Sequence, residues 1–176
     1  MFPVPKKVVL KNGLNALIRP LKGTDKKQLL RFYDEISDKT KHQLFQSCKT
    51  FEAWRTVAVK SSYLYTDGLD IDFKKKYSVI AVVEDEGTTK IIGDGRFFID
   101  PVGWRSEIYL VTHELYRNIG VGSALMDYML EALTNLKVKE VYCYISPDNI
   151  HMLRLIDKYN FNKESQDGFY LFWRRL

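Results

Sequence analysis

The segment from residue 108 to residue 136 constrains the fold of this chain more than any other. It opens with a short apolar run over 108–111, continues through polar residues, and reaches the pattern Arg117-x-x-Gly120-x-Gly122. From residue 121 onward, apolar residues recur at the i, i+3, i+4 spacing of an amphipathic helix. The chain is therefore predicted to pass from a strand, through a turn containing glycine, into a helix.

This turn has the composition of an anion site. Glycine lets backbone N–H groups come close to a ligand, and the first turn of a helix adds N–H donors and a partial positive charge. Together these groups suit a phosphate, and Arg117 adds a cation. The turn is not a Walker loop, because Gly122 is followed by Ser123-Ala124, and it lacks the Gly-x-Gly-x-x-Gly dinucleotide fingerprint. On these residues alone, an ordinary strand–helix turn stays open as the alternative.

Length and composition predict a single soluble domain over residues 1–176. The chain has 176 residues, of which 45% are hydrophobic and 28% charged, and this suits one globular domain with a sizeable core. No apolar run approaches the ~20 residues that a membrane helix needs, and the N-terminus lacks the apolar stretch of a secretory signal. The two cysteines, Cys48 and Cys143, make no disulfide framework, so we expect a cytoplasmic location.

The charge pattern limits the partners. A formal net charge of +5 helps to attract polyanions. The lysines are scattered, and the run over 74–76 is typical of a solvated loop, so nucleic acid is not an expected partner. The histidines and cysteines do not fall at metal-ligand spacing, so no metal is expected. The oligomeric state stays open.

Periodicity and turn residues predict the remaining elements. A hairpin is expected over 7–22 around the Asn12-Gly13 turn. Thr24 or Asp25, and then Ser37 or Asp38, are expected to cap the next two helices. Helices are expected over 24–36, 37–48, 51–64, 121–136 and 149–159, strands over 77–83, 90–99, 107–112, 140–146 and 168–174, and irregular chain over 63–76. Three successive strands with short connections form an antiparallel meander, and the whole pattern predicts an α+β fold with a mixed sheet.

The Arg-x-x-Gly-x-Gly turn after an apolar strand resembles the acyl-CoA loop of the GCN5-related N-acetyltransferase (GNAT) superfamily. A second segment over 141–161 resembles the same family, with a strand, then Asn149, then a helix that ends in Asn160-Phe161. Asn160 stands where the family has glycine, and asparagine also accepts the left-handed conformation at a helix end. The resemblance implies a GNAT-like, mostly antiparallel sheet with helices on both faces.

Within the superfamily, the chain is most similar to the Pat-type protein lysine acetyltransferases. The similarity lies in the opening residues 9–37, in Ser106-Glu107-Ile108, and in Asn149-x-x-Met152-Leu153-x-Leu155. It implies acetyl-CoA as co-substrate and a protein lysine as acceptor. The stretch over 51–76 matches no such pattern and could carry a different substrate selection.

The resemblance also implies how acetyl-CoA binds. The pantetheine arm would lie between the strands over 107–112 and 141–146, with backbone groups of the first strand beside its amides. The N–H groups of the glycine turn would hold the pyrophosphate, and the asparagine before the last helix would reach the arm. The implied binding residues are Leu110, Val111, Thr112, Arg117, Asn118, Ile119, Gly120, Val121, Gly122, Ser123 and Asn149.

Glu107 is the candidate for the base that an amine acceptor requires. A lysine ammonium, with a pKa of ~10.4, is not a nucleophile until it loses a proton, and burial beside aromatic residues would raise the pKa of the carboxyl towards neutrality. The alternative is an exposed glutamate paired with Arg105. His113 is a rival base for which a surface or CoA-contact role is favoured, and Glu114 is expected to be a solvated turn residue.

Many GNAT enzymes carry a tyrosine on the last helix that protonates the leaving thiolate, and Ile156 stands there in this chain. Tyr109, Tyr144 and Tyr159 are expected to pack in the core. The residues therefore predict an acetyl-CoA-dependent N-acetyltransferase acting on a protein lysine. An enzyme for a small amine or a peptide N-terminus, or a non-catalytic acyl-CoA-binding module, stays open.

Overall fold

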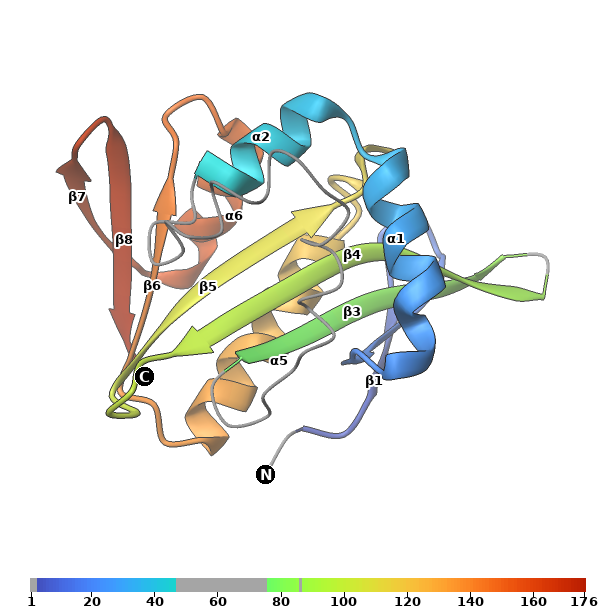
Figure 1. The fold of residues 1–176 in the computed structure, drawn as a ribbon, viewed down its shortest axis with the longest axis horizontal. Coiled ribbons are helices and arrows are strands. Elements are labelled where there is room, and N and C mark those ends of the chain that lie inside the picture. The colour runs from blue at the N-terminus through green and yellow to red at the C-terminus, as the bar shows by residue number, and fades with distance from the viewer. Residues whose placement is uncertain (1–2, 47–75, 86) are drawn as a thin grey trace.

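The computed structural model describes residues 3–46, 76–85 and 87–176 (Figure 1). The helix expected over 51–64 and most of the irregular chain expected over 63–76 lie outside the described residues. Within these ranges, no helix is both long and apolar enough to cross a bilayer.

One eight-stranded sheet organises the described chain, in the order β1-β2-β3-β4-β5-β6-β8-β7. Its strands are β1 (Lys6–Val9), β2 (Asn15–Pro20), β3 (Lys76–Asp85), β4 (Thr88–Ile99), β5 (Arg105–Thr112), β6 (Glu140–Ile145), β7 (Asn162–Gln166) and β8 (Phe169–Arg175). Among them only β5 and β6 run parallel, and the other neighbours are antiparallel. The predicted mixed, mostly antiparallel sheet is confirmed.

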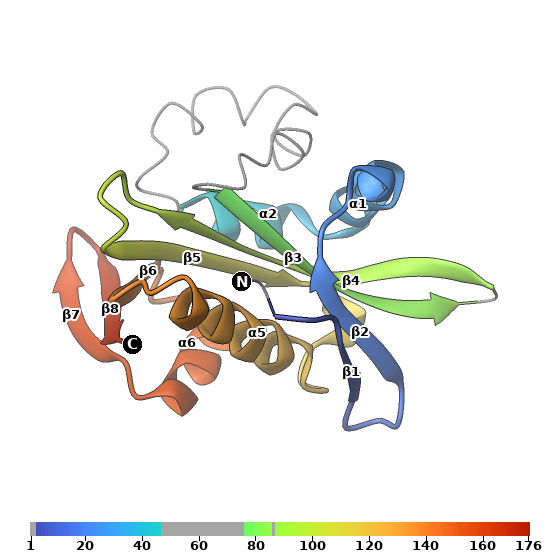
Figure 2. The same cartoon turned by 90° about the horizontal axis from the view of Figure 1, so that it is seen from below.

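Helices cover both faces of the sheet (Figure 2). The helices α1 (Lys26–Glu35) and α2 (Asp38–Gln46) lie on one face, and α5 (Val121–Asn135) and α6 (Ile150–Ile156) on the other. Short 3-10 turns at Gly23–Asp25, Glu114–Tyr116 and Asp157–Tyr159 lie next to them. The predicted α+β architecture with helices on both faces is therefore confirmed.

The larger core lies between α5 and the sheet. Leu125 and Met129 of α5 are fully buried, and full burial of such a side chain stabilises the fold by about 1.5–3 kcal/mol. The helix can lie close to β4 because that strand has glycine where it faces the helix. A Cβ at Gly95 would lie 2.9 Å from Met129 Sδ, and one at Gly93 would lie 2.9 Å from Leu125 Cδ1.

A smaller core lies under α1, where Leu29 and Phe32 pack against the opposite face of the sheet. The N-terminus of α1 lacks the expected cap from Asp25, because the Asp25 side chain makes no cap hydrogen bond to the helix. The Asp25 carboxylate instead accepts two hydrogen bonds from the Arg19 guanidinium, at 2.7 and 2.8 Å, and both residues are buried. Ser37 does cap α2, because its Oγ accepts from Thr40 N at 3.2 Å.

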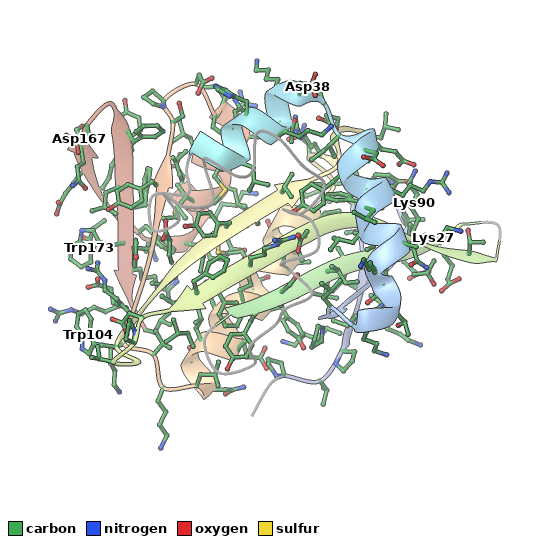
Figure 3. The ribbon with its side chains drawn as sticks, in the orientation of Figure 1. Lys27, Asp38, Lys90, Trp104, Asp167 and Trp173 are labelled. Carbon is green, nitrogen blue, oxygen red and sulfur yellow. The ribbon has the colours of Figure 1, made fainter. Side chains whose placement is uncertain are left out.

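The C-terminal hairpin contains a strand that the sequence pattern did not predict. Every residue of β7 is exposed, so the apolar alternation that marks a half-buried strand is missing. Pairing with β8 forms β7 nonetheless, and Figure 3 shows Asp167 at the tip of this hairpin and Trp173 on β8. Asn160, just before β7, has φ of 53° and confirms the expected left-handed end of the last helix.

Candidate functional site

A cleft opens where the two parallel strands separate. Pairing between β5 and β6 covers three positions and ends at Glu107 and Tyr142, after which the strands diverge (Figure 1). The cleft measures about 1070 Å³ with its open mouth included. Its walls come from the far half of β5, from Cys143 and Tyr144 of β6, from the turn before α5, and from α2 and α6.

The structure brings most of the predicted binding residues into this one cleft. Those that line it are Leu110, Val111, Thr112, Arg117, Asn118, Gly120, Gly122, Ser123 and Asn149. Ile119 and Val121 do not line it. The backbone carbonyl of Ile119 accepts from Lys11 N at 2.9 Å and its side chain packs against the main core, in which Val121 is buried. These contacts fix the turn to the rest of the molecule.

The turn before α5 presents backbone donors to the cleft. Gly120 has φ of 107°, a conformation that favours glycine, and its carbonyl accepts the first α5 hydrogen bond, from Ala124 N at 3.0 Å. The N–H groups of residues 121–123 lie before that first bond, so by helix geometry they have no carbonyl partner within the helix. Of these three residues, Gly122 and Ser123 line the cleft. A Cβ at Gly122 would lie 3.3 Å from Leu155 Cδ2, so a longer side chain there would occupy the cleft.

Cationic side chains surround the same end of the cleft. The basic residues that line it are Lys11, Arg117, His151, Arg154 and Lys158. Arg117 and Arg154 are close enough to His151 to act on it, because burial and then the charges of Arg117, Arg154 and Lys39 lower the pKa of His151. The cationic rim and the helix N–H groups together suit a ligand with several phosphates. Nothing in the sequence pattern connected Arg154 or Lys158 with the glycine turn.

The helix α2 lies across the mouth of the cleft, which the sequence pattern did not predict. Thr40, Gln43 and Leu44 line the cleft from this helix. Arg117, just beyond β5, donates from Nη2 to Thr40 Oγ1 at 2.6 Å and from Nε to the Thr112 carbonyl at 3.3 Å. Gln43 donates to Asp148, just beyond β6, at 3.5 Å. The helix thus connects the far ends of the two diverging strands.

Glu114 fixes this connection and is not the solvated turn residue that was expected. Its Oε1 accepts from Ser37 N at 3.0 Å, from Ser37 Oγ at 2.7 Å and from Thr40 Oγ1 at 2.5 Å. Burial alone would raise the pKa of Glu114, but the hydrogen bonds from Thr40 and Ser37 outweigh it and lower the pKa to about 2. The carboxylate therefore stays charged at neutral pH and holds the start of α2 against the end of β5.

Glu114→Gln should destabilise the fold by about 1–2 kcal/mol at pH 7, because it removes charge-assisted hydrogen bonds on a partly exposed group. The folded pKa lies below the ordinary value of 4.5, so the contribution is present above pH 4.5 and is lost as pH falls towards 2. Denaturant unfolding at several pH values should show the difference between variant and wild type narrowing as pH falls. Glu84→Gln, at an exposed position, should change stability by less than ~0.5 kcal/mol. A difference for Glu114→Gln that does not vary with pH would contradict this role.

Glu107 lies on β5 directly before Ile108 and Tyr109, which line the inner end of the cleft; it does not itself line the cleft, and only 1% of it is exposed. Burial and then the charge of Glu107 raise the pKa of Cys143 and of Tyr144, so its carboxylate acts directly on two residues of the cleft wall. The alternative of an exposed pair with Arg105 is wrong. Arg105 Nη2 lies 2.7 Å from Glu140 Oε1, and its guanidinium carbon lies 4.4 Å from the centre of the Tyr142 ring.

His113 is neither at the surface nor at the cleft. Only 6% of it is exposed, its Nδ1 accepts from Leu115 N at 3.3 Å, and its Nε2 lies 3.5 Å from Glu35 Oε2. It lies six residues beyond Glu107, which is about 20 Å along an extended strand. The structure therefore separates His113 from the inner end of the cleft, where a base would act.

Tyr109 is buried and Tyr159 packs against the main core, as expected. The Tyr159 hydroxyl donates to Asp127 Oδ1 at 2.8 Å and to the Ser123 carbonyl at 3.1 Å, which joins the 3-10 turn after α6 to the start of α5. Tyr109 also lines the cleft, and so does Tyr144, which was expected in the core. Ile156 is fully buried in the main core.

Comparison with known proteins agrees with this geometry. The "Acetyltransferase (GNAT) family" matches residues 41–161. Acetyltransferase PA5475 of Pseudomonas aeruginosa is 22% identical over 140 residues, covering 80% of this chain and 71% of that protein. The GNAT domain of S. lividans PAT has a TM-score of 0.82 at 20% identity, with all of both chains covered. Mycobacterium smegmatis RimJ in complex with CoA-disulfide has a TM-score of 0.70 at 10% identity, covering 97% of this chain and 86% of that one. With its family match over more than half of its length, this chain belongs to the GNAT acetyltransferases, whose co-substrate is acetyl-CoA.

Proposed function

We propose that this acetyltransferase transfers the acetyl group of acetyl-CoA to a lysine side chain of a protein. One observation carries the proposal: a single cleft joins a cationic mouth, rich in backbone N–H donors, to an inner end beside the buried carboxylate of Glu107. A thioester with a long phosphorylated arm fits the first end. A cationic amine fits the second, because a buried carboxylate attracts an ammonium and can accept its proton.

The two ends of acetyl-CoA would make different contacts. The pyrophosphate would lie at the N–H groups over 121–123, with Arg117 beside it, and the pantetheine arm would follow the open edge of β5 past Leu110 and Thr112. Asn149 lines the cleft opposite. Its side chain already accepts from Met152 N at 3.2 Å as the cap of α6, so its amide nitrogen is the group that would turn to the arm.

In the reaction we propose, Glu107 accepts a proton from the incoming ammonium, directly or through a water molecule. The neutral amine then attacks the thioester carbonyl, and CoA leaves as a thiolate. Holding amine and thioester in one cleft makes the attack effectively unimolecular. Removing the proton is necessary because an ammonium of pKa ~10.4 is almost entirely protonated at pH 7.

Two observations support a protein lysine as the acceptor. The segments of the chain that resemble Pat-type enzymes lie on both sides of the cleft: Glu107 is on β5, and Met152 and Leu155 are on α6. The described fold is also similar to the GNAT domain of S. lividans PAT along its whole length.

The acceptor can be assigned by measuring thiol release from acetyl-CoA with three classes of amine. These are lysine-containing proteins with their lysine peptides, peptides whose only amine is the N-terminus, and polyamines. We expect the first class to give the highest kcat/KM, with mass spectrometry placing the acetyl group on a lysine Nζ. Preferential turnover of polyamines or of peptide N-termini would replace the proposed acceptor.

CoA binding should raise the pKa of His151. Burial and the neighbouring cations lower this pKa in the free protein, and phosphates placed among the same cations would stabilise the imidazolium. The shift can be followed by NMR titration of the imidazole with and without saturating CoA. Pantetheine, which has no phosphate, should leave the titration unchanged. Identical titrations with and without CoA would place the phosphates away from this rim.

A further inference from the structure

Breaking the C–S bond of acetyl-CoA leaves a thiolate that has to acquire a proton. We infer that the hydroxyl of Tyr144 donates this proton. The inference rests on the proposed acetyl transfer in the cleft and assigns one further residue to it. Ile156 has no proton to give, and it is fully buried in the core.

Tyr144 is placed at the junction between the carboxylate and the cleft. It follows Tyr142, the register partner of Glu107, by two residues on β6. Side chains two apart on a strand share a face, so Tyr144 extends from the face that carries Glu107, one step further into the region where the strands have separated. Tyr144 lines the cleft there, and the Tyr142 and Tyr144 rings meet edge to face with centroids 6.1 Å apart.

The electrostatic surroundings keep the Tyr144 hydroxyl protonated. Burial raises its pKa, and so do the negative charges of Glu107 and Asp167, while Arg105 acts in the opposite direction. A phenol that stays protonated at neutral pH can donate to a thiolate that forms next to it. The ordinary pKa values, ~10 for a tyrosine and ~8.5 for a thiol, make that transfer uphill by itself. It is driven to completion because the phenolate takes a proton from the far more acidic nitrogen as the nitrogen becomes an amide.

The other tyrosines near the cleft are less suited to this step. The Tyr159 hydroxyl already donates to Asp127. The ring of Tyr109 lines the cleft, but its hydroxyl oxygen is buried. Tyr142 lies before the strands separate, under the guanidinium of Arg105, and it is not among the residues that line the cleft.

The protons and bonds balance with this assignment. Glu107 takes one proton from the ammonium, and the amine nitrogen forms its bond to the carbonyl carbon. The tetrahedral intermediate then breaks its C–S bond, and the sulfur takes the proton of the Tyr144 hydroxyl. The resulting phenolate recovers a proton from the nitrogen, which becomes an amide. Glu107 releases its proton to solvent, so one turnover produces acetyl-lysine, CoA as the thiol, and one proton.

Tyr144→Phe tests this role because it removes the hydroxyl and keeps the ring. We expect kcat to fall by about tenfold to 10²-fold, near the lower end for general acid catalysis because a thiolate is a moderately good leaving group. Affinity for acetyl-CoA should stay within about threefold of wild type. Tyr142→Phe, the same change two residues away at a position that does not line the cleft, should keep kcat within about twofold. Equal losses in both variants would indicate a packing effect and overturn the assignment.

A second measurement needs no acceptor and so stays informative if the proposed lysine substrate is wrong. A hydroxyl that donates to the sulfur stabilises the thiolate, so Tyr144→Phe should raise the pKa of the bound CoA thiol by about one relative to wild type. This pKa can be read from the ultraviolet absorbance of the thiolate across pH, after subtracting the protein alone. Glu107, Asp167 and Arg105 act equally in both proteins. An unchanged thiol pKa in a folded variant that binds CoA would remove Tyr144 from this role.

Discussion

Glu107→Gln should lower kcat/KM by about 10²-fold or more at pH 7. Glutamine keeps the shape and the hydrogen-bonding capacity of the side chain while removing its basicity, and general base catalysis contributes 10²–10⁴-fold. Affinity for acetyl-CoA should stay within about threefold, or ~0.7 kcal/mol, because Glu107 is buried in β5 and is not among the cationic residues that line the cleft. The deficit should shrink as pH rises, since more of the amine then arrives already neutral.

Glu140→Gln is the matched control for this experiment. Glu140 is also a largely buried carboxylate, one strand away, but it is paired with Arg105 at 2.7 Å and lies at the end of the β5–β6 pairing that is further from the point where the strands diverge. It should keep nearly full activity at every pH. A Glu107→Gln variant that is folded and gives a flat pH profile near wild type would remove Glu107 as the base, and the reaction would then have to proceed from amine that is already neutral.

The order of elements around the cleft could be predicted because it depends on local patterns. An apolar run, a glycine turn and an i, i+3, i+4 series predict β5, the turn and α5 from neighbouring residues alone. The structure places these elements within one or two residues of the expected bounds. Gly120 adopts its positive φ where the turn requires it, and Asn160 ends the last helix in the left-handed conformation.

The mouth of the cleft could not be predicted, because contacts between distant parts of the chain form it. Thr40 and Arg117 meet across 77 positions of sequence, and Gln43 and Asp148 across 105. The hydrophobic periodicity of a sequence carries no information about contacts between residues so far apart. Glu114 shows the consequence: a short polar turn predicts a solvated carboxylate, but the start of α2 lies against it and supplies three donors.

Tertiary packing also overturned two predictions made from residue type. A histidine after a strand suggests a surface role, yet the ring of His113 lies against Phe32 and Tyr116 and is buried. An aspartate before a helix suggests a cap, yet the Asp25 carboxylate accepts two charge-assisted hydrogen bonds from the Arg19 guanidinium and one from the backbone N–H of Lys22, and none from α1. In both cases a neighbour from another element determined the role of the side chain.

Gly122→Glu should weaken acetyl-CoA binding by at least about 10²-fold while leaving the fold intact. The φ of Gly122 is not positive, so the backbone accepts a side chain. The added Cβ would lie 3.3 Å from the terminal methyl group of Leu155 and 3.8 Å from Leu110 Cδ1, which directs the rest of the glutamate into the cleft beside the N–H groups over 121–123. The carboxylate would then repel the pyrophosphate, and such a contact between like charges weakens binding by several kcal/mol.

Two further variants at Gly122 separate the effect of charge from that of volume. Gly122→Ala adds only the Cβ, and the flexible end of Leu155 can move by a few tenths of an ångström, so calorimetry should show acetyl-CoA affinity within about fivefold of wild type, or ~1 kcal/mol. Gly122→Gln has nearly the volume of glutamate without its charge and should fall between the two. If Gln and Glu weaken binding equally, exclusion by volume explains the loss and the anion does not lie at this helix start. If the Gly122→Glu variant binds acetyl-CoA as tightly as the wild type, with an unchanged melting temperature, the cofactor arm does not pass this turn at all.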